Sequence, residues 1–164
     1  MKEDQNMQFI SEEHDHQHCI VTALADAEQL CLQRKQRFTA LRKRVFELVW
    51  QQHKPIRAYE VLSRLQQDGR AAPPTVYRAL DFLLELGLIH RIESLNAYVG
   101  CSTPGQKHTE QFLICTRCDA FTELNSALIN KAINESATQS GFKIKQQMIE
   151  ITGICPNCQT EESN

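Results

Sequence analysis

Four of the seven cysteines in this 164-residue chain form two C-x2-C pairs. By residue type and spacing, these four are the best candidates for metal binding in the chain. The pairs are Cys115 with Cys118 and Cys155 with Cys158, and 36 residues separate them. Two cysteines three positions apart on a turn can direct both thiolates at one tetrahedral ion, and two such turns close a four-sulfur site with no open position. Ligand softness favours Zn(II), and a closed site is structural. The competing interpretations are a dithiol redox pair and buried free cysteines.

A second, more scattered set of possible ligands flanks the expected domain junction. It consists of one thiol, two imidazoles and one carboxylate: His90, Cys101, His108 and Glu123. Spacing alone does not identify these four residues as metal ligands, because single His and Cys residues are usually core or surface groups. An ion bound by ligands from both domains would fix the domain angle, since the binding energy is realised only when all ligands converge.

Catalytic motifs are a poor match to this sequence. His108-Thr-Glu110 followed by a C-x2-C pair is superficially similar to zinc deaminases, which combine H-x-E with P-C-x-x-C. Here four residues separate Glu110 from Cys115, and Ile114 stands where the proline would be. No G-x-S-x-G or P-loop run is present. We therefore expect neither an enzyme nor a small-molecule substrate.

The charge of the chain is distributed unevenly, although its net value is −2. Residues 1–33 hold one basic and seven acidic side chains, residues 34–91 hold twelve and five, and residues 92–164 hold five and eight. A basic module between acidic segments is expected of a domain that neutralises phosphates, although a solvated basic face gives the same pattern. The sequence has no run of 18 apolar residues and no secretory pattern at its start, so we expect a cytoplasmic protein without a membrane span.

The elements predicted for the first part of the chain are those of a winged helix-turn-helix. Helical periodicity begins at Ile20, a second helix follows Thr39 as its N-cap, a third spans about 58–67, and a fourth runs from Pro73 toward Gly87. Two β-favouring runs, Leu88 to Glu93 and Ala97 to Cys101, then suggest a hairpin.

The rest of the chain predicts a small α/β unit, so the expected fold class is α+β. Strands are expected at Gln111 to Cys115, Ala120 to Glu123 and Phe142 to Thr152, with a helix at about Ser126 to Thr138. The expected divisions are a disordered acidic arm at 1–18, the winged-helix domain at 19–101, a hinge linker at 102–108 and the α/β domain at 109–164. The arm contains His14, His16 and His18 beside Cys19, and their role stays open, as does that of Cys31.

The sequence closely resembles the Fur superfamily of metal-responsive repressors at three places: Pro73-Pro-Thr-Val-Tyr-Arg-Ala-Leu-Asp-Phe-Leu, His90-Arg-Ile-Glu-Ser and the two cysteine pairs. The resemblance covers about Ala25 to Gln159, and the best match within the superfamily is its zinc-uptake branch. It implies a DNA-binding winged helix, a C-terminal dimerisation domain, and a homodimer that binds inverted-repeat operators when loaded with zinc. Repression of zinc-uptake genes follows from it.

The resemblance also implies two zinc sites per subunit. The four paired cysteines match the structural site, and His90, Cys101, His108 and Glu123 match the regulatory site of the zinc-responsive members. Iron-type relatives place a histidine-rich run before the first cysteine pair, where this chain has Lys107-His-Thr-Glu-Gln-Phe-Leu-Ile. A thiolate in the regulatory set also favours zinc over iron or manganese.

For DNA, the resemblance implies that Tyr59 and Arg78 approach bases, and arginine is well suited to the guanine edge in the major groove. Contacts with phosphates are then expected from Thr75, Tyr77, Arg37, Thr39 and Arg42. Tyr77 could instead be a core aromatic. The usual Thr-Pro-Gln-Arg of the family is Thr39-Ala-Leu-Arg42 here. Alternative functions are an iron or peroxide sensor of the same superfamily and a zinc-ribbon module that binds protein.

Overall fold

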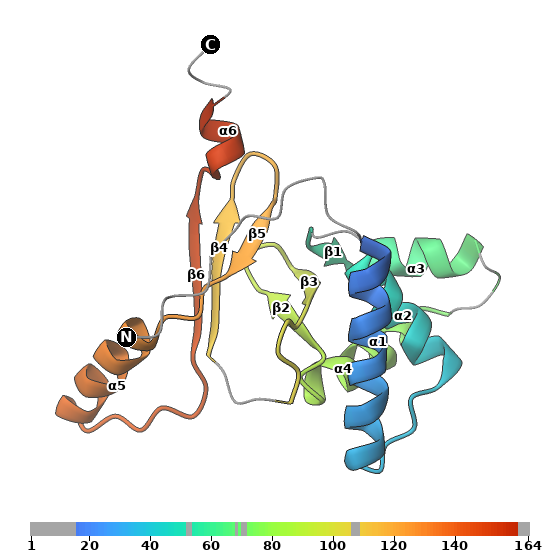
Figure 1. Cartoon of the computed structure of the whole chain (residues 1–164), viewed down its shortest axis with the longest axis horizontal. Coiled ribbons are helices and arrows are strands. Elements are labelled where there is room, and N and C mark those ends of the chain that lie inside the picture. Colours follow the sequence, from blue (N-terminus) through green and yellow to red (C-terminus); the bar gives the residue numbers. More distant parts are fainter. Residues whose placement is uncertain (1–15, 52–53, 68, 70–71, 106–108, 161–164) are drawn as a thin grey trace. The chain divides into compact units, whose positions relative to one another are not determined.

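The computed structural model describes residues 16–51, 54–67, 69, 72–105 and 109–160, and the chain divides into two compact units between residues 106 and 107 (Figure 1). The first unit is mainly helical and the second is built on a sheet. The predicted α+β class is therefore confirmed. Among the described helices, none is long and apolar enough to cross a membrane.

The described part of the first unit consists of four helices and a three-stranded antiparallel sheet. Its helices are α1 (His16–Gln33), α2 (Ala40–Trp50), α3 (Ala58–Gln67) and α4 (Pro73–Glu85). The strands are β1 (Ile56–Arg57), β2 (Ile89–Ile92) and β3 (Ala97–Gly100), with β3 between the other two. Helices α3 and α4 followed by the β2–β3 hairpin form the predicted winged helix-turn-helix.

The ends of α2 and α4 follow the predicted capping residues. The Thr39 hydroxyl accepts a hydrogen bond from the backbone N–H of Arg42 at 3.4 Å, so Thr39 is the N-cap of α2. After α4, Gly87 has φ of +68°, a conformation that costs glycine little. The Leu88 N–H then donates to the Leu83 carbonyl at 2.9 Å, which closes the helix and starts the hairpin.

One apolar core holds the first unit together. Each of the four helices contributes buried side chains to it, and the hairpin adds Leu88 and Ile89. Phe46 of α2 and Leu80 of α4 are among the largest fully buried side chains. Because this core comes from five or more elements, the helix that would enter a DNA groove rests on a packed base.

Two features of the first unit differ from the sequence-based expectation. Helix α1 begins at His16, so the predicted disordered arm of residues 1–18 extends too far by three residues; residues 1–15 lie outside the described part of the chain. Strand β1 was not predicted, because two residues are too few to show a periodicity. It exists because Ile56 pairs with Tyr98 on the free edge of β3.

Within residues 109–160, the second unit is a three-stranded sheet with two helices. Its elements are β4 (Glu110–Cys115), β5 (Phe121–Glu123), α5 (Ala127–Gln139), β6 (Met148–Gly153) and α6 (Pro156–Thr160). In the sheet, β4 lies between β5, with which it is antiparallel, and β6, with which it is parallel. A parallel pair needs a long connection, and the chain makes it through β5 and α5.

The expected strand from Phe142 to Thr152 is wrong in its first half. The Phe142 N–H donates to the Ala137 carbonyl at 2.8 Å across Gly141, whose φ is +70°, so Phe142 belongs to the closing turn of α5. Residues 143–147 follow as irregular chain, and β6 starts at Met148. Apolar residues at 142 and 144 imitate a strand pattern that local helix closure overrides.

Substitution of Gly100 tests how tightly the hairpin packs on α2. A Cβ at Gly100 would overlap the Trp50 indole, so we expect Gly100→Ala to lower the free energy of unfolding by about 1–3 kcal/mol. Gly153→Ala is the matched control, because a Cβ there meets no atom within 4 Å. Urea denaturation measures both; equal stability of the two variants would show that the indole moves aside freely.

Candidate metal centre and nucleic-acid interface

The parallel pairing of β4 with β6 brings the two cysteine pairs together. Cys115 is the last residue of β4 and pairs with Gly153, the last residue of β6. Because both strands run in the same direction, both C-x2-C segments leave the sheet at the same edge. The backbone N–H of Thr116 continues the pairing by donating to the Gly153 carbonyl at 2.9 Å.

Each cysteine pair has a local structure that turns its two sulfurs to one side. After Cys118, Asp119 has φ of +57°, and its N–H donates to the Cys115 carbonyl at 3.1 Å. The second pair instead uses the short helix α6, since Cys155 precedes Pro156 and Cys158 lies within the helix. Proline suits a first helical position, so this turn follows from the sequence Cys-Pro-Asn-Cys.

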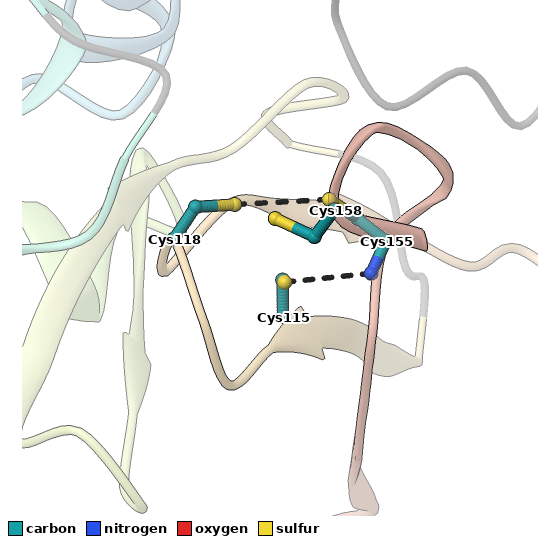
Figure 2. A group of neighbouring side chains, drawn as sticks. All are labelled: Cys115, Cys118, Cys155 and Cys158. Carbon is teal, nitrogen blue, oxygen red and sulfur yellow. Dashed lines mark hydrogen bonds between the residues drawn. The ribbon is translucent and has the colours of Figure 1, made fainter. Parts of the chain in front are cut away.

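The four thiols form a compact cluster. Their sulfur atoms all lie within 4.8 Å of one another, and the side chains point toward a common centre (Figure 2). The Cys118 and Cys155 sulfurs are 3.7 Å apart. Sulfurs at about 2.3 Å from a tetrahedral zinc ion lie about 3.8 Å apart, so this spacing fits zinc. It is the one group of three or more His, Cys, Asp or Glu side chains in the described residues that could hold a metal ion.

The electrostatics of the cluster favour a bound cation. Burial raises the pKa of the Cys115 thiol, but hydrogen bonds from the backbone N–H groups of Cys155, Arg117 and Cys118 outweigh it and lower the pKa to about 6. Hydrogen bonding with Cys155 and burial raise the pKa of Cys158 to about 12. One thiolate therefore forms readily, and the cluster resists further ionisation until a cation compensates the charge.

The scattered ligand set falls on both units. In the first unit, His90 and Cys101 are buried, and the Cys101 N–H donates to the Leu88 carbonyl at 3.1 Å. Since His90 pairs with Val99, His90 and Cys101 are diagonal neighbours on one face of the hairpin. Glu123 is the half-buried last residue of β5. His108 lies outside the described residues.

The expected base-contacting residues are exposed on the helix-turn-helix. Tyr59 in the first turn of α3 is 61% exposed, and Tyr77 in α4 is 51% exposed, which excludes a core position for Tyr77. Thr75 and Arg78 are also exposed, and they share the first half of α4 with Tyr77. The opposite face of α4 is buried, so the helix presents these side chains to solvent while packing on the core.

Arg42 has contacts that its predicted role did not include. Its guanidinium lies over the Phe82 ring, 3.4 Å from the ring centroid, and it donates to the Arg37 carbonyl. Phe82 belongs to α4, so Arg42 links the start of α2 to that helix. Arg37 and Thr39 are exposed beside it. The sequence motif suggested a phosphate contact and gave no sign of the packing role.

Three other cysteine and histidine side chains described in the first unit, Cys31, Cys19 and His18, differ in their exposure. Cys31 is 1% exposed, and burial raises the pKa of its thiol, which makes it a core side chain. Cys19 is half-buried and His18 is exposed at the start of α1. His14 lies outside the described residues.

A group in the second unit was missed by the motifs because it contains only neutral polar side chains. Thr109, Gln111, Asn130 and Gln147 form one hydrogen-bonded cluster. The available signal was Gln111, a polar residue directly before the apolar run Phe112-Leu-Ile of β4, and it is fully buried.

The chain is similar to known proteins over most of its length. The family model described as the ferric uptake regulator family matches residues 33–152. The zinc uptake regulation protein of Escherichia coli (strain K12) is 42% identical over 137 residues, which are 82% of this chain and 80% of that protein.

Two solved structures share the fold. A zinc uptake regulator complexed with zinc and DNA gives a TM-score of 0.82 at 38% identity, covering 93% of this chain and all of that one. The crystal structure of holo XcZur gives a TM-score of 0.78 at 37% identity, covering 85% of this chain and 98% of that one.

Zinc affinity at the four-cysteine cluster should fall as pH falls. Without metal, Cys158 keeps its proton at neutral pH because its pKa is raised to about 12, and the ion must displace that proton. Each proton released weakens binding about tenfold per unit of falling pH. Competition with a chelating indicator between pH 6.5 and 8 measures the slope; an affinity independent of pH would contradict thiolate ligation.

Proposed function

This chain belongs to the ferric uptake regulator family, and we propose that it is a zinc-responsive transcriptional repressor that binds DNA. The zinc-loaded homodimer binds inverted-repeat operators and represses zinc-uptake genes. Its DNA target places its action in the cytoplasm. The observation that carries the proposal is the likeness, over nearly the whole chain, to a regulator solved with zinc and DNA.

The four-cysteine cluster is the structural zinc site in this proposal. Cys115, Cys118, Cys155 and Cys158 supply four sulfur donors, so no coordination position remains for exchange with small ligands. Zinc at such a site contributes directly to folding energy, because an unfolded chain cannot present the four thiolates together. The ion would fasten β4 to β6 at one edge of the sheet.

A second zinc ion per subunit is proposed at the regulatory set. His90 and Cys101 supply nitrogen and sulfur from one face of the hairpin, and His108 and Glu123 supply nitrogen and oxygen from the following part of the chain. One thiolate with imidazole and carboxylate suits zinc better than iron or manganese. Fewer sulfur donors than in the cysteine cluster should make this ion the exchangeable one. We retain 102–108 as the proposed linker between the two domains.

The exposed half of α4 is the proposed base-reading surface. Arg78 is proposed to meet guanine, with Tyr59 beside the same groove. Phosphate contacts are proposed for Thr75, Tyr77, Arg37, Thr39 and Arg42. Arg42 supports this surface through its packing on Phe82. Asp81 and Glu85 are exposed farther along α4, where their charge would repel phosphates, so the first turns enter the groove.

The apolar surface of the second unit supports the proposed homodimer. No residue of α5 is buried, and Leu128 on it is 80% exposed. Phe142 is 68% exposed, and a groove of about 640 Å³ runs between α5 and residues 142–149. Exposed apolar surface of this kind marks an interface, and a second copy of the chain would cover it.

An iron or peroxide sensor is the second candidate, because family membership alone allows it. The regulatory thiol argues against it, and metal-selective operator binding distinguishes the two. An iron sensor would respond to Fe(II) at concentrations where zinc has no effect. A protein-binding zinc module would instead show DNA affinity that changes little with salt.

Removal of the regulatory thiol should abolish the zinc response and leave the fold intact. We expect Cys101→Ala to bind operator with the affinity of the zinc-free protein at any zinc concentration, while retaining one zinc ion per chain. Titration of labelled operator by fluorescence anisotropy, with and without zinc, measures this. Cys31→Ala, which removes a buried thiol outside the regulatory set, is the control. Zinc-responsive binding by Cys101→Ala would exclude this residue as a ligand.

Arg78 should contribute sequence specificity. Arg78→Ala is expected to weaken operator binding by about 1–3 kcal/mol and random DNA much less, because the lost contact is to a base. Glu85→Gln on the same helix should leave operator affinity equal or slightly higher. Electrophoretic mobility shifts on both DNAs measure the difference. An equal loss on operator and random DNA would assign Arg78 to phosphates.

A further inference from the structure

The neutral side chains around Asn130 connect β4, α5 and the segment before β6, and we call Thr109, Gln111, Asn130 and Gln147 the Asn130 cluster. The Asn130 Oδ1 atom accepts three hydrogen bonds: from the Thr109 hydroxyl at 2.7 Å, from Gln111 Nε2 at 2.6 Å and from Gln147 Nε2 at 3.1 Å. Gln111 Nε2 also donates to the Thr109 hydroxyl at 3.1 Å. One side chain of α5 is therefore held from two other segments of the second unit.

The Asn130 cluster gives α5 a directional attachment. No side chain of α5 is buried, so apolar packing within the subunit holds this helix weakly. A helix held only by loose apolar contacts can rotate or slide on a sheet. Hydrogen bonds fix direction as well as distance, so the cluster selects one rotation of α5.

The groove between α5 and residues 142–149 lies directly beside the Asn130 cluster. Gln147 belongs to both, because it lines the groove and donates to Asn130. None of the described residues that line the groove is charged. A second subunit can therefore cover this surface without removing a charge from water, which is a costly step in forming an interface.

Hydrogen bonds join the two walls of this groove at both ends. At one end, the Phe142 N–H donates to the Ala137 carbonyl at 2.8 Å in the turn that closes α5. At the other end, the connection is the hydrogen bond from Gln147 to Asn130. The first connection is made by the backbone of a local turn, whereas the second depends on side chains alone. Substitution of Asn130 should therefore loosen the groove while the turn remains.

The Asn130 cluster places a polar side chain in the interior of the second unit. Gln111 is fully buried, and an apolar side chain of similar size would avoid the cost of taking an amide out of water. Buried hydrogen-bonded networks make a structure more rigid and specify one arrangement of its elements. The cluster is therefore better suited to fixing the geometry of α5 than to adding apolar stability.

We propose that the Asn130 cluster fixes the rotation of α5 and the width of the groove, and thereby sets how tightly two subunits associate. The inference rests on the proposed function, because it takes this apolar surface as the homodimer interface. A surface held in its bound geometry loses less conformational freedom on association, so such preorganisation strengthens binding. Asn130 and Gln111 are positioning residues, which act through α5 without having to touch the second subunit.

The test measures subunit exchange in the full-length homodimer, with zinc retained at the cysteine cluster. Dimers that carry donor or acceptor dyes at their N-termini are mixed, and the rise in energy transfer gives the dissociation rate. Asn130→Ala removes the central acceptor, and alanine favours the helical state, so α5 itself is not weakened. We expect exchange to be about tenfold faster, because changes at an interface act mainly on the dissociation rate. Asn130→Asp keeps an acceptor oxygen and should exchange at nearly the unsubstituted rate.

Asn134→Ala is the matched control, because Asn134 is exposed one turn farther along α5 and donates to a backbone carbonyl of the same helix. Its subunit exchange should be unchanged. Equal exchange rates in Asn130→Ala and Asn134→Ala, or equal acceleration by Asn130→Ala and Asn130→Asp, would overturn the inference. Circular dichroism and zinc retained at the cysteine cluster show that each variant is folded. If Asn130→Ala does not fold, Gln111→Met decides the outcome, since it removes the donor from β4 and should also accelerate exchange.

The unsubstituted chain separates this inference from the proposed function. If it is a monomer, the proposed homodimer fails, and the inference fails with it. If it forms a dimer and Asn130→Ala exchanges at the unsubstituted rate, the inference alone fails. Operator binding by the unsubstituted dimer that ignores zinc would contradict the proposed repressor, while faster exchange in Asn130→Ala would still support the inference.

Discussion

The parallel pairing of β4 with β6 is the constraint on which the second unit depends. The register that places Cys115 opposite Gly153 delivers both cysteine pairs to one edge of the sheet. Four thiols within 4.8 Å of one another cannot all ionise unless a cation compensates their charge. The same strand pairing therefore favours binding of a metal ion. A small sheet whose long helix buries no side chain gains little from its own core, which explains why a metal would contribute to its folding.

The two units are stabilised in different ways, and the difference suits a sensor. The first unit has an apolar core shared by its helices and hairpin, so α4, the helix proposed to face DNA, can keep its shape without metal. The second unit combines the four-cysteine cluster, a hydrogen-bonded cluster of neutral side chains around Asn130 and an exposed apolar face. In the proposed function, the ion at the cysteine cluster maintains the fold while a second, weaker site responds to zinc. The low net charge of −2 is consistent with weak nonspecific DNA affinity. Operator binding would then depend more strongly on zinc.

Local signals in the sequence were sufficient for much of this structure. Thr39 and Gly87 mark helix ends through local backbone hydrogen bonds and conformation, which depend little on tertiary contacts. The spacing of the paired cysteines predicts a metal site. Features that depend on tertiary contact were missed or misplaced: the short β1, the start of β6 and the packing of Arg42 on Phe82. The hydrogen-bonded cluster around Asn130 has no sequence motif. Its neutral side chains come together only when the fold brings β4, α5 and the segment before β6 together.

The central claim is that one zinc ion maintains the fold and a second controls DNA binding. Zinc per chain can be counted during stepwise chelation while operator affinity and dimer content are followed in the same samples. The account predicts that the first ion removed abolishes operator binding and leaves a folded dimer with one zinc ion per chain. Loss of both ions in a single step, or operator binding that persists until the last ion is removed, would contradict it.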